Sequence, residues 1–148
     1  EGFAAGEKIV VLLGDNLFER EISPYVKNFE NQEEGARVLL KQVGEPERFG
    51  IAALDEKQVI DIEEKPDNPN SEYAVVGCYM YDYKVFDIID GIEPSGRGEL
   101  EITSVNKRYI EVNQLHYDIY EGRWMDAGTV ESYFEANRIM MENDNELL

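Results

Sequence analysis

The stretch Ile9-Val-Val-Leu-Leu-Gly-Asp-Asn16 decides the fold of this chain. Its five consecutive apolar residues, most of them β-branched, predict a strand buried on both faces, which is typical of a parallel sheet covered by helices. The run stops at Gly14, and the carboxylate of Asp15 follows at once. Ligands of open α/β sheets bind beyond the carboxyl ends of the strands. The local sequence leaves two interpretations open for Asp15: a functional carboxylate, or part of a simple turn.

The composition excludes several classes of protein. Against 14 Lys and Arg stand 32 Asp and Glu, and the formal net charge of −18 argues against a general nucleic-acid or membrane-surface binder. A few placed cations or a metal can still hold a phosphorylated ligand. The single cysteine, Cys78, fits a reducing, cytoplasmic setting. It is expected to be a buried structural residue, because the only histidine, His116, lies in a different predicted strand.

Strands and helices alternate along the chain and predict one α/β domain with a mostly parallel sheet. Strands are predicted at 9–13, 36–43, 51–54, 59–64, 73–83 and 115–119, the third and fourth forming a hairpin. Helices are predicted from an N-cap at Ser23 to about 33, at 85–89, from about 100 to 112, and after a cap at Thr129. The inner face of the last helix is predicted to carry Tyr133, Phe134, Asn137, Met140 and Met141. The tail 143–148 is expected to be loosely held.

A carboxylate continues the apolar face of the strand at 59–64. With a period of two, Ile60, Ile62 and Glu64 lie on the same face. A carboxylate on a buried face needs hydrogen-bond donors, which either the protein or a polyhydroxyl ligand supplies. Lys65 follows, before Pro66, where the chain stays extended. The alternative interpretation is a strand end whose charges lie in solvent.

A second carboxylate, Asp126, lies just before Gly128 and the cap of the last helix. One interpretation is an Asx turn that leads into the helix. The other is a carboxylate that faces Asp15 from a separate strand end. Two such acids can hold Mg²⁺, which prefers one or two carboxylates completed by water and phosphate oxygens.

Exposed charges near these positions could reach a ligand. Arg97 lies between two glycines just before a predicted helix, Glu99 follows it, and Arg123 lies close to Asp126 in the sequence. Plain loop chemistry explains each of them equally well, so each is a weak signal when taken alone.

Together these segments resemble the sugar-1-phosphate nucleotidylyltransferases, and the resemblance covers Ile9 to about Glu142. Five motifs appear in the family's order, and the third and fourth favour its thymidylyl/uridylyl branch. They are Leu13-Gly-Asp-Asn16, Phe49-Gly50, Ile62-Glu-Glu-Lys-Pro66, Gly98-Glu-Leu-Glu-Ile-Thr103 and Trp124-Met-Asp-Ala-Gly-Thr129.

The resemblance implies a Rossmann-like mixed α/β fold, a mostly parallel sheet flanked by helices, and cytoplasmic Mg²⁺-dependent chemistry. In the branch that this chain resembles, dTMP passes from dTTP to glucose 1-phosphate at the start of dTDP-rhamnose synthesis, and the protein is a homo-oligomer, a tetramer by analogy. Carried over by motif, the catalytic residues would be Asp15, Lys65 and Asp126: the two aspartates would hold Mg²⁺, and Lys65 would contact the sugar phosphate. The sugar pocket would involve Gly50, Glu64, Tyr79, Arg97 and Glu99, while Arg123 is a further candidate for phosphate.

The sequence departs from the family pattern in two local positions and one large one. Ser104 stands where the family usually has Asp, and Ala127 where it usually has Thr. The family's opening Gly-rich loop has no counterpart, so 1–148 is expected to be an N-terminally truncated domain that is inactive by itself. The alternatives are a uridylyl or guanylyl transferase acting on another sugar 1-phosphate, and a non-catalytic sugar-phosphate-binding regulatory domain.

Overall fold

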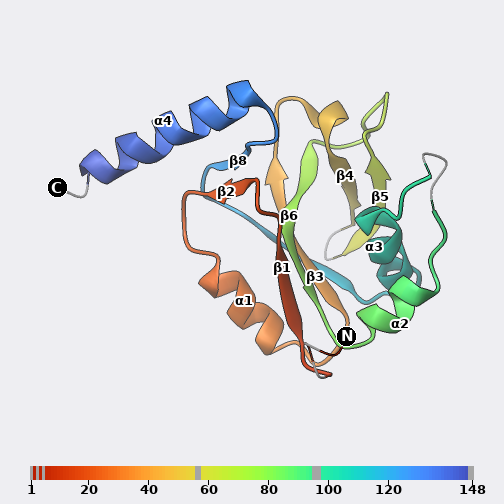
Figure 1. Cartoon of the computed structure of the whole chain (residues 1–148). Helices are drawn as coiled ribbons and strands as arrows, with labels where there is room; N and C mark the ends of the chain where they lie inside the picture. Colours follow the sequence, from red (N-terminus) through yellow and green to blue (C-terminus); the bar gives the residue numbers. More distant parts are fainter. Residues whose placement is uncertain (1, 3, 5, 56–57, 95–97, 147–148) are drawn as a thin grey trace.

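The computed structural model describes residues 2, 4, 6–55, 58–94 and 98–146, which form a mixed sheet flanked by helices (Figure 1). In chain order the elements are β1 (Ile9–Leu12), β2 (Asn16–Phe18), α1 (Ser23–Glu30), β3 (Ala36–Gln42), the short 3₁₀ helix η1 (Pro46–Arg48), β4 (Gly50–Leu54), β5 (Val59–Glu64), β6 (Tyr73–Tyr81), α2 (Val85–Asp90), α3 (Ile102–Glu111), β7 (Leu115–Ile119), β8 (Trp124–Asp126) and α4 (Val130–Glu146).

Strand β6 organises the main sheet, whose order is β5-β4-β6-β3-β7, with β1 also paired to β6. Among the described strands, β3 and β7 pair in parallel and the other pairs of this sheet are antiparallel. Because β1, β3 and β4 are each antiparallel to β6 and β7 is parallel to β3, these four strands run in one direction, while β5 and β6 run in the other. The mixed α/β class, the β4–β5 hairpin and the parallel β1-α1-β3 connection are therefore confirmed.

Side chains of β6 alternate between two hydrophobic cores. Tyr79 and Tyr81 face the core that α2 and α3 cover. Cys78 and Met80 face the core that Phe29 of α1 completes. Burial raises the pKa of Cys78 to about 11, so its thiol stays protonated at neutral pH. This confirms the prediction of a buried structural cysteine.

The first strand differs from its prediction. Val10 is 41% exposed and Leu12 is 51% exposed, so β1 is not buried on both faces. Only Ile9 and Val11 pack against the core. Val10 and Leu12 point to the opposite face of β1 and belong to neither hydrophobic core, and no described strand pairs with the free edge of β1. A continuous apolar run therefore shows that a strand is suited to burial on both faces. It does not show that both faces of β1 are buried in the described part of the chain.

Two further local predictions are corrected by the backbone. Ile22, not Ser23, occupies the N-cap of α1, and Ser23 is the first residue of the helix. Ile60 is 54% exposed, because a register shift in the β4–β5 pairing breaks the alternation of β5. Such bulges turn one side chain away from its expected face.

The last helix begins as predicted, but it packs differently. The Thr129 hydroxyl accepts a hydrogen bond from the Ser132 backbone N–H, so Thr129 caps α4. Tyr133 and Phe134 are nevertheless exposed rather than turned inward, and Figure 1 shows α4 extending away from the sheet. With no Gly or Pro to stop it, α4 runs to Glu146 and includes residues 143–146 of the predicted loose tail. None of the helices in the described ranges is long and apolar enough to cross a membrane.

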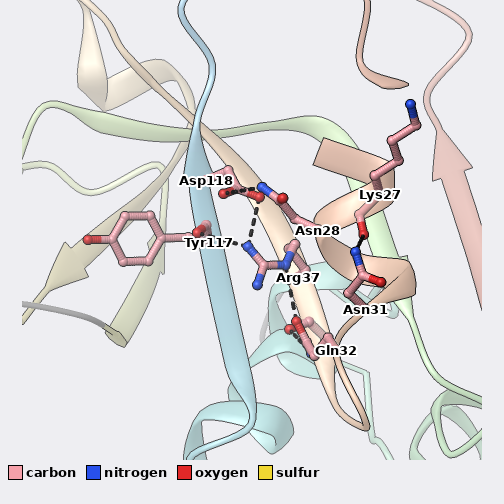
Figure 2. Close-up of polar contacts among 8 residues, drawn as sticks. Lys27, Asn28, Asn31, Gln32, Arg37, Tyr117 and Asp118 are labelled. Carbon is pink, nitrogen blue, oxygen red and sulfur yellow. Dashed lines mark hydrogen bonds and ion pairs between the residues drawn. The ribbon is translucent and has the colours of Figure 1, made fainter. Parts of the chain in front are cut away.

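A cluster of polar side chains fastens α1 to the β3–β7 edge of the sheet (Figure 2). Arg37 of β3 donates to the Asp118 carboxylate at 2.7 Å and to Gln32 Oε1 at 3.1 Å. Asn28 of α1 donates to the other Asp118 oxygen at 3.1 Å. We call these four residues the Arg37 cluster, and its ion pair is largely buried, with side-chain exposures of 15% and 20%.

Candidate functional site

The two candidate metal ligands lie side by side, although they are far apart in the sequence. Strands β2 and β8 form a small antiparallel sheet in which Asn16 is paired with Asp126, and the Ala127 N–H donates to the Asp15 carbonyl at 2.7 Å. An atom placed where a side chain at Gly128 would begin lies 3.0 Å from Asp126 Oδ1 and 3.7 Å from Asp15 Oδ2. Both carboxylates therefore border the same space, which the missing side chain of Gly128 leaves open.

Asn16 fixes this arrangement to the main sheet. Its Oδ1 accepts from the Gly77 N–H at 3.0 Å and from Trp124 Nε1 at 2.8 Å, while its Nδ2 donates to Asp15 Oδ1 at 2.9 Å. A Cβ at position 77 would lie 2.5 Å from Asn16 Cγ, so only glycine fits there. Sequence reasoning missed this role, although a glycine inside a long strand is a signal of close approach by another group.

A cavity of about 280 Å³, which we call the site cavity, opens beside these residues. It is bordered by five of the predicted site residues: Gly50, Glu64, Lys65, Tyr79 and Asp126. Glu64 is half-buried, and its Oε2 accepts from the Thr103 hydroxyl of α3 at 2.9 Å. A Cβ at Gly50 would lie 3.1 Å from the same oxygen, so the glycine leaves this carboxylate uncovered.

Tyr79 and Lys65 give the cavity one neutral and one charged group. Tyr79 is buried, and this burial, followed by the nearby charge of Glu64, raises its pKa to about 12. The phenol therefore stays protonated at neutral pH, able to donate and to accept a hydrogen bond. Lys65 is exposed just after β5, and its φ of 46° is left-handed, which is uncommon outside glycine, so the prediction of an extended chain at this residue was wrong.

An arginine that shares the cavity with Asp126 is one that sequence reasoning missed. Arg48 of η1 borders the cavity, and its guanidinium lies 5.5 Å from the centre of the Phe49 ring. A hydrogen bond and charge from Glu45 raise its pKa, and Asp126 adds to this effect. The motif Phe49-Gly50 lies directly after Arg48, but nothing in the local sequence distinguishes this arginine from a loop charge.

The remaining candidates lie elsewhere. Arg123 pairs with Glu19, with 3.3 Å between Nε and Oε1. The Glu19 N–H also donates to the Arg123 carbonyl, which extends the β2–β8 ladder, and neighbouring residues of a strand face opposite sides. Trp124 faces the cavity, so Arg123 faces away. Glu99 is exposed outside the residues that border the cavity, and Arg97 lies outside the described residues.

The carboxylates of Asp15 and Asp126 fit a hard divalent cation whose other ligands come from water and from a bound phosphate. Searched over the described residues, the chain has no cluster of three or more His, Cys, Asp or Glu that could hold a metal. Two carboxylates are nevertheless the usual protein share of a Mg²⁺ site whose other ligands are waters and phosphate oxygens. Asp15 and Asp126 are the residues that could hold such an ion.

Comparison with known proteins agrees with this geometry. A family model described as nucleotidyl transferase matches residues 1–143. A glucose-1-phosphate thymidylyltransferase of Xanthomonas campestris pv. campestris (strain B100) is 42% identical over 139 residues, which are 90% of this chain and 47% of that protein. The low-salt glycan biosynthesis nucleotidyltransferase Agl11 of Haloferax volcanii is 37% identical, over 95% of this chain and 40% of that protein.

A solved structure gives the same result. A Bacillus anthracis protein, provisionally described as a glucose-1-phosphate thymidylyltransferase and solved with sucrose, matches with a TM-score of 0.87 and 50% identity. The match covers 93% of this chain and 56% of that one. This chain spans about half the length of the curated relatives that it matches.

Proposed function

Because the chain belongs to the nucleotidyl transferase family, we propose that its protein is a glucose-1-phosphate thymidylyltransferase. The reaction is the Mg²⁺-dependent transfer of dTMP from dTTP to glucose 1-phosphate, which gives dTDP-glucose and pyrophosphate. One observation carries the proposal: two carboxylates from separate strands, Asp15 and Asp126, border one space at the edge of a cavity with polar walls.

Asp15 and Asp126 are the residues that would hold Mg²⁺. When bound, the ion neutralises charge on the phosphates and stabilises the charge that develops during transfer. Without a cation the two carboxylates would repel a polyphosphate, so an ion held by this pair would let a chain of net charge −18 bind such a substrate.

The other cavity residues hold the sugar phosphate for attack. An oxygen of the sugar phosphate forms a bond to the α-phosphorus of dTTP, and the bond from that phosphorus to pyrophosphate breaks. Lys65 holds the phosphate group, while Glu64 and Tyr79 form hydrogen bonds with sugar hydroxyls and the Gly50 backbone lies against the ring. Phosphoryl-type transfer depends on such alignment and charge neutralisation more than on a base.

The proposal extends to the setting of the whole protein. We propose a cytoplasmic homo-oligomer, a tetramer by analogy with the family, that supplies dTDP-glucose for dTDP-rhamnose synthesis. The support is the similarity to relatives that bear the thymidylyltransferase name.

The test is pyrophosphate release by the purified protein that contains this chain. Release is expected with glucose 1-phosphate, dTTP and Mg²⁺ together, and chelation of the metal should abolish it. Turnover with UTP or GTP in preference to dTTP would instead favour a uridylyl or guanylyl transferase. Tight binding of glucose 1-phosphate without pyrophosphate release from any nucleotide would favour a regulatory sugar-phosphate-binding domain.

A further inference from the structure

Besides Arg48 and Tyr79, a third polar side chain that borders the site cavity, Asn106, lies outside the five motifs that carry the family resemblance. Asn106 of α3 borders the cavity and is 1% exposed. It lies one turn beyond Thr103 on the same helix, so both residues face the end of β5 and the Glu64 carboxylate.

The orientation of the Asn106 amide is fixed by a buried tyrosine. The Tyr81 hydroxyl donates to Asn106 Oδ1 at 2.7 Å, and Tyr81 is only 1% exposed. A flipped amide would leave the phenolic proton without an acceptor in the core, which is costly. Oδ1 is therefore committed to Tyr81, and the NH₂ group must lie on the other side of the amide.

This NH₂ group faces the cavity without a partner. Asn106 Nδ2 donates to none of the described residues. Within the described part of the chain, every fully enclosed side-chain nitrogen and oxygen has a hydrogen-bond partner. Nδ2 must therefore be reachable from the cavity. A donor that is buried and yet unused indicates a site that a ligand completes.

The groups around the cavity alternate between donors and acceptors. Glu64 presents a carboxylate, which only accepts at neutral pH, and Asn106 presents an amide NH₂, which only donates. Tyr79, 5% exposed, adds a hydroxyl that can do both. A sugar hydroxyl also does both, so a polyhydroxyl ligand can bond with each of these groups at once.

We propose that Asn106 is a specificity-determining residue, whose Nδ2 donates a hydrogen bond to one hydroxyl oxygen of the bound sugar, and that Tyr81 positions it. This inference rests on the proposed function, since it concerns the sugar of the same sugar phosphate. Tyr81 does not border the cavity, and its hydroxyl reaches the site through the amide that it holds, while its ring stacks on that of Tyr79 with 6.3 Å between the ring centres.

The test compares glucose 1-phosphate with each of its monodeoxy analogues by isothermal titration calorimetry on the full protein. The key variant combines Tyr81→Phe with Asn106→Leu, because replacing both partners of a buried hydrogen bond by apolar groups of similar shape can be nearly neutral for folding. Asn137→Leu on the exposed face of α4 is the matched control.

Wild type should bind one of the analogues about tenfold more weakly than glucose 1-phosphate. The double variant should bind glucose 1-phosphate as weakly as that analogue and no longer distinguish the two, while Asn137→Leu behaves as wild type. A folded double variant that still discriminates like wild type would overturn the role of Asn106. Failure of wild type to bind glucose 1-phosphate would overturn the proposed function as well, so the two failures are distinguishable.

Tyr81→Phe alone decides the question if circular dichroism shows that the double variant is unfolded. Tyr81→Phe keeps the Asn106 amide but removes the hydroxyl that holds it in one orientation. The ratio of affinities for glucose 1-phosphate and the same analogue should therefore fall about threefold, with affinity for dTTP unchanged. Unchanged discrimination in a folded Tyr81→Phe protein would contradict the proposal.

Discussion

The Arg37 cluster and the site cavity are both assemblies of partly buried polar side chains, and they differ in whether their side chains bond mainly to one another or leave whole groups without protein partners. In the cluster, both Asp118 oxygens accept bonds, and Arg37 reaches Asp118, Gln32 and the Tyr117 carbonyl (Figure 2). In the cavity, the amide NH₂ of Asn106 and the hydroxyl of Tyr79 have no hydrogen bonds to described residues. A closed network stabilises the fold, whereas an open one is left for a ligand to complete.

The comparison predicts that an acid of the site matters for activity and not for folding. Asp126→Asn should lower kcat/KM for pyrophosphate release about a thousandfold, because the amide removes one of two charges that would hold Mg²⁺. The melting temperature should stay the same or rise, since two carboxylates no longer border one space. Steady-state kinetics and calorimetry on the same samples measure both. Activity near the wild-type level would exclude the metal-pair assignment.

The same substitution in the closed network should have the opposite outcome. Asp118→Asn removes the charge that Arg37 needs in a largely buried position, and we expect a loss of about 1–3 kcal/mol in the free energy of unfolding. The KM for glucose 1-phosphate should not change, because the cluster lies between α1, β3 and β7, away from the cavity. Urea titration gives the first quantity and initial rates the second. A raised KM in a stable Asp118→Asn protein would break the distinction between the two regions.

The sequence predicted the cavity in part because strand ends are visible in sequence patterns. Asp15 follows the apolar run at 9–13 and Glu64 ends the strand at 59–64, so the patterns indicated a strand end for both, whereas Asp126 was singled out by the turn before the last helix and by the family resemblance. The hydrogen bonds of Asn16 to Gly77 and Trp124 could not be predicted, because they join three strands whose pairing the sequence does not state. The roles assigned to these residues remain predictions.

The surface charges and the exposed apolar faces were harder to predict, for a related reason. In the sequence, Arg123 and Arg48 both look like exposed loop charges. In the structure, the β2–β8 ladder turns Arg123 towards Glu19, whereas η1 places Arg48 at the cavity. Periodicity also gave α4 an apolar face without saying whether another element covers it, and Phe134 is 68% exposed. Patterns within an element fix which side chains share a face, whereas contacts between elements fix what that face meets.

The two arginines offer a smaller test of the open cavity. Arg48→Gln should raise the KM for glucose 1-phosphate about tenfold, because a guanidinium that borders the cavity beside Asp126 can form a charge-assisted bond with a phosphate. Its present partner Glu45 is exposed, so that ion pair holds it only weakly. Arg123→Gln is the matched control and should leave KM within about twofold. Equal effects of both substitutions would mean that only the overall charge matters.

The smallest expected effect concerns pH and the closed network. His116 is paired with Arg37 across the β3–β7 ladder, and burial, followed by the positive charge of Arg37, lowers its pKa below the ordinary 6.5. Between pH 6.5 and the lower pKa of the folded state, the imidazole of His116 binds a proton in the unfolded chain but not in the folded chain. The free energy of unfolding therefore falls as the pH falls through this window.

His116→Gln should remove this contribution, which we expect to be less than about 1 kcal/mol because His116 is only partly buried. Urea titrations of both proteins at about pH 8 and about pH 5.5 isolate it, since the many carboxylates shift both proteins alike. Wild type should lose slightly more stability on acidification than His116→Gln does. An equal loss would show that neither burial nor the charge of Arg37 lowers the pKa of His116 enough to affect stability.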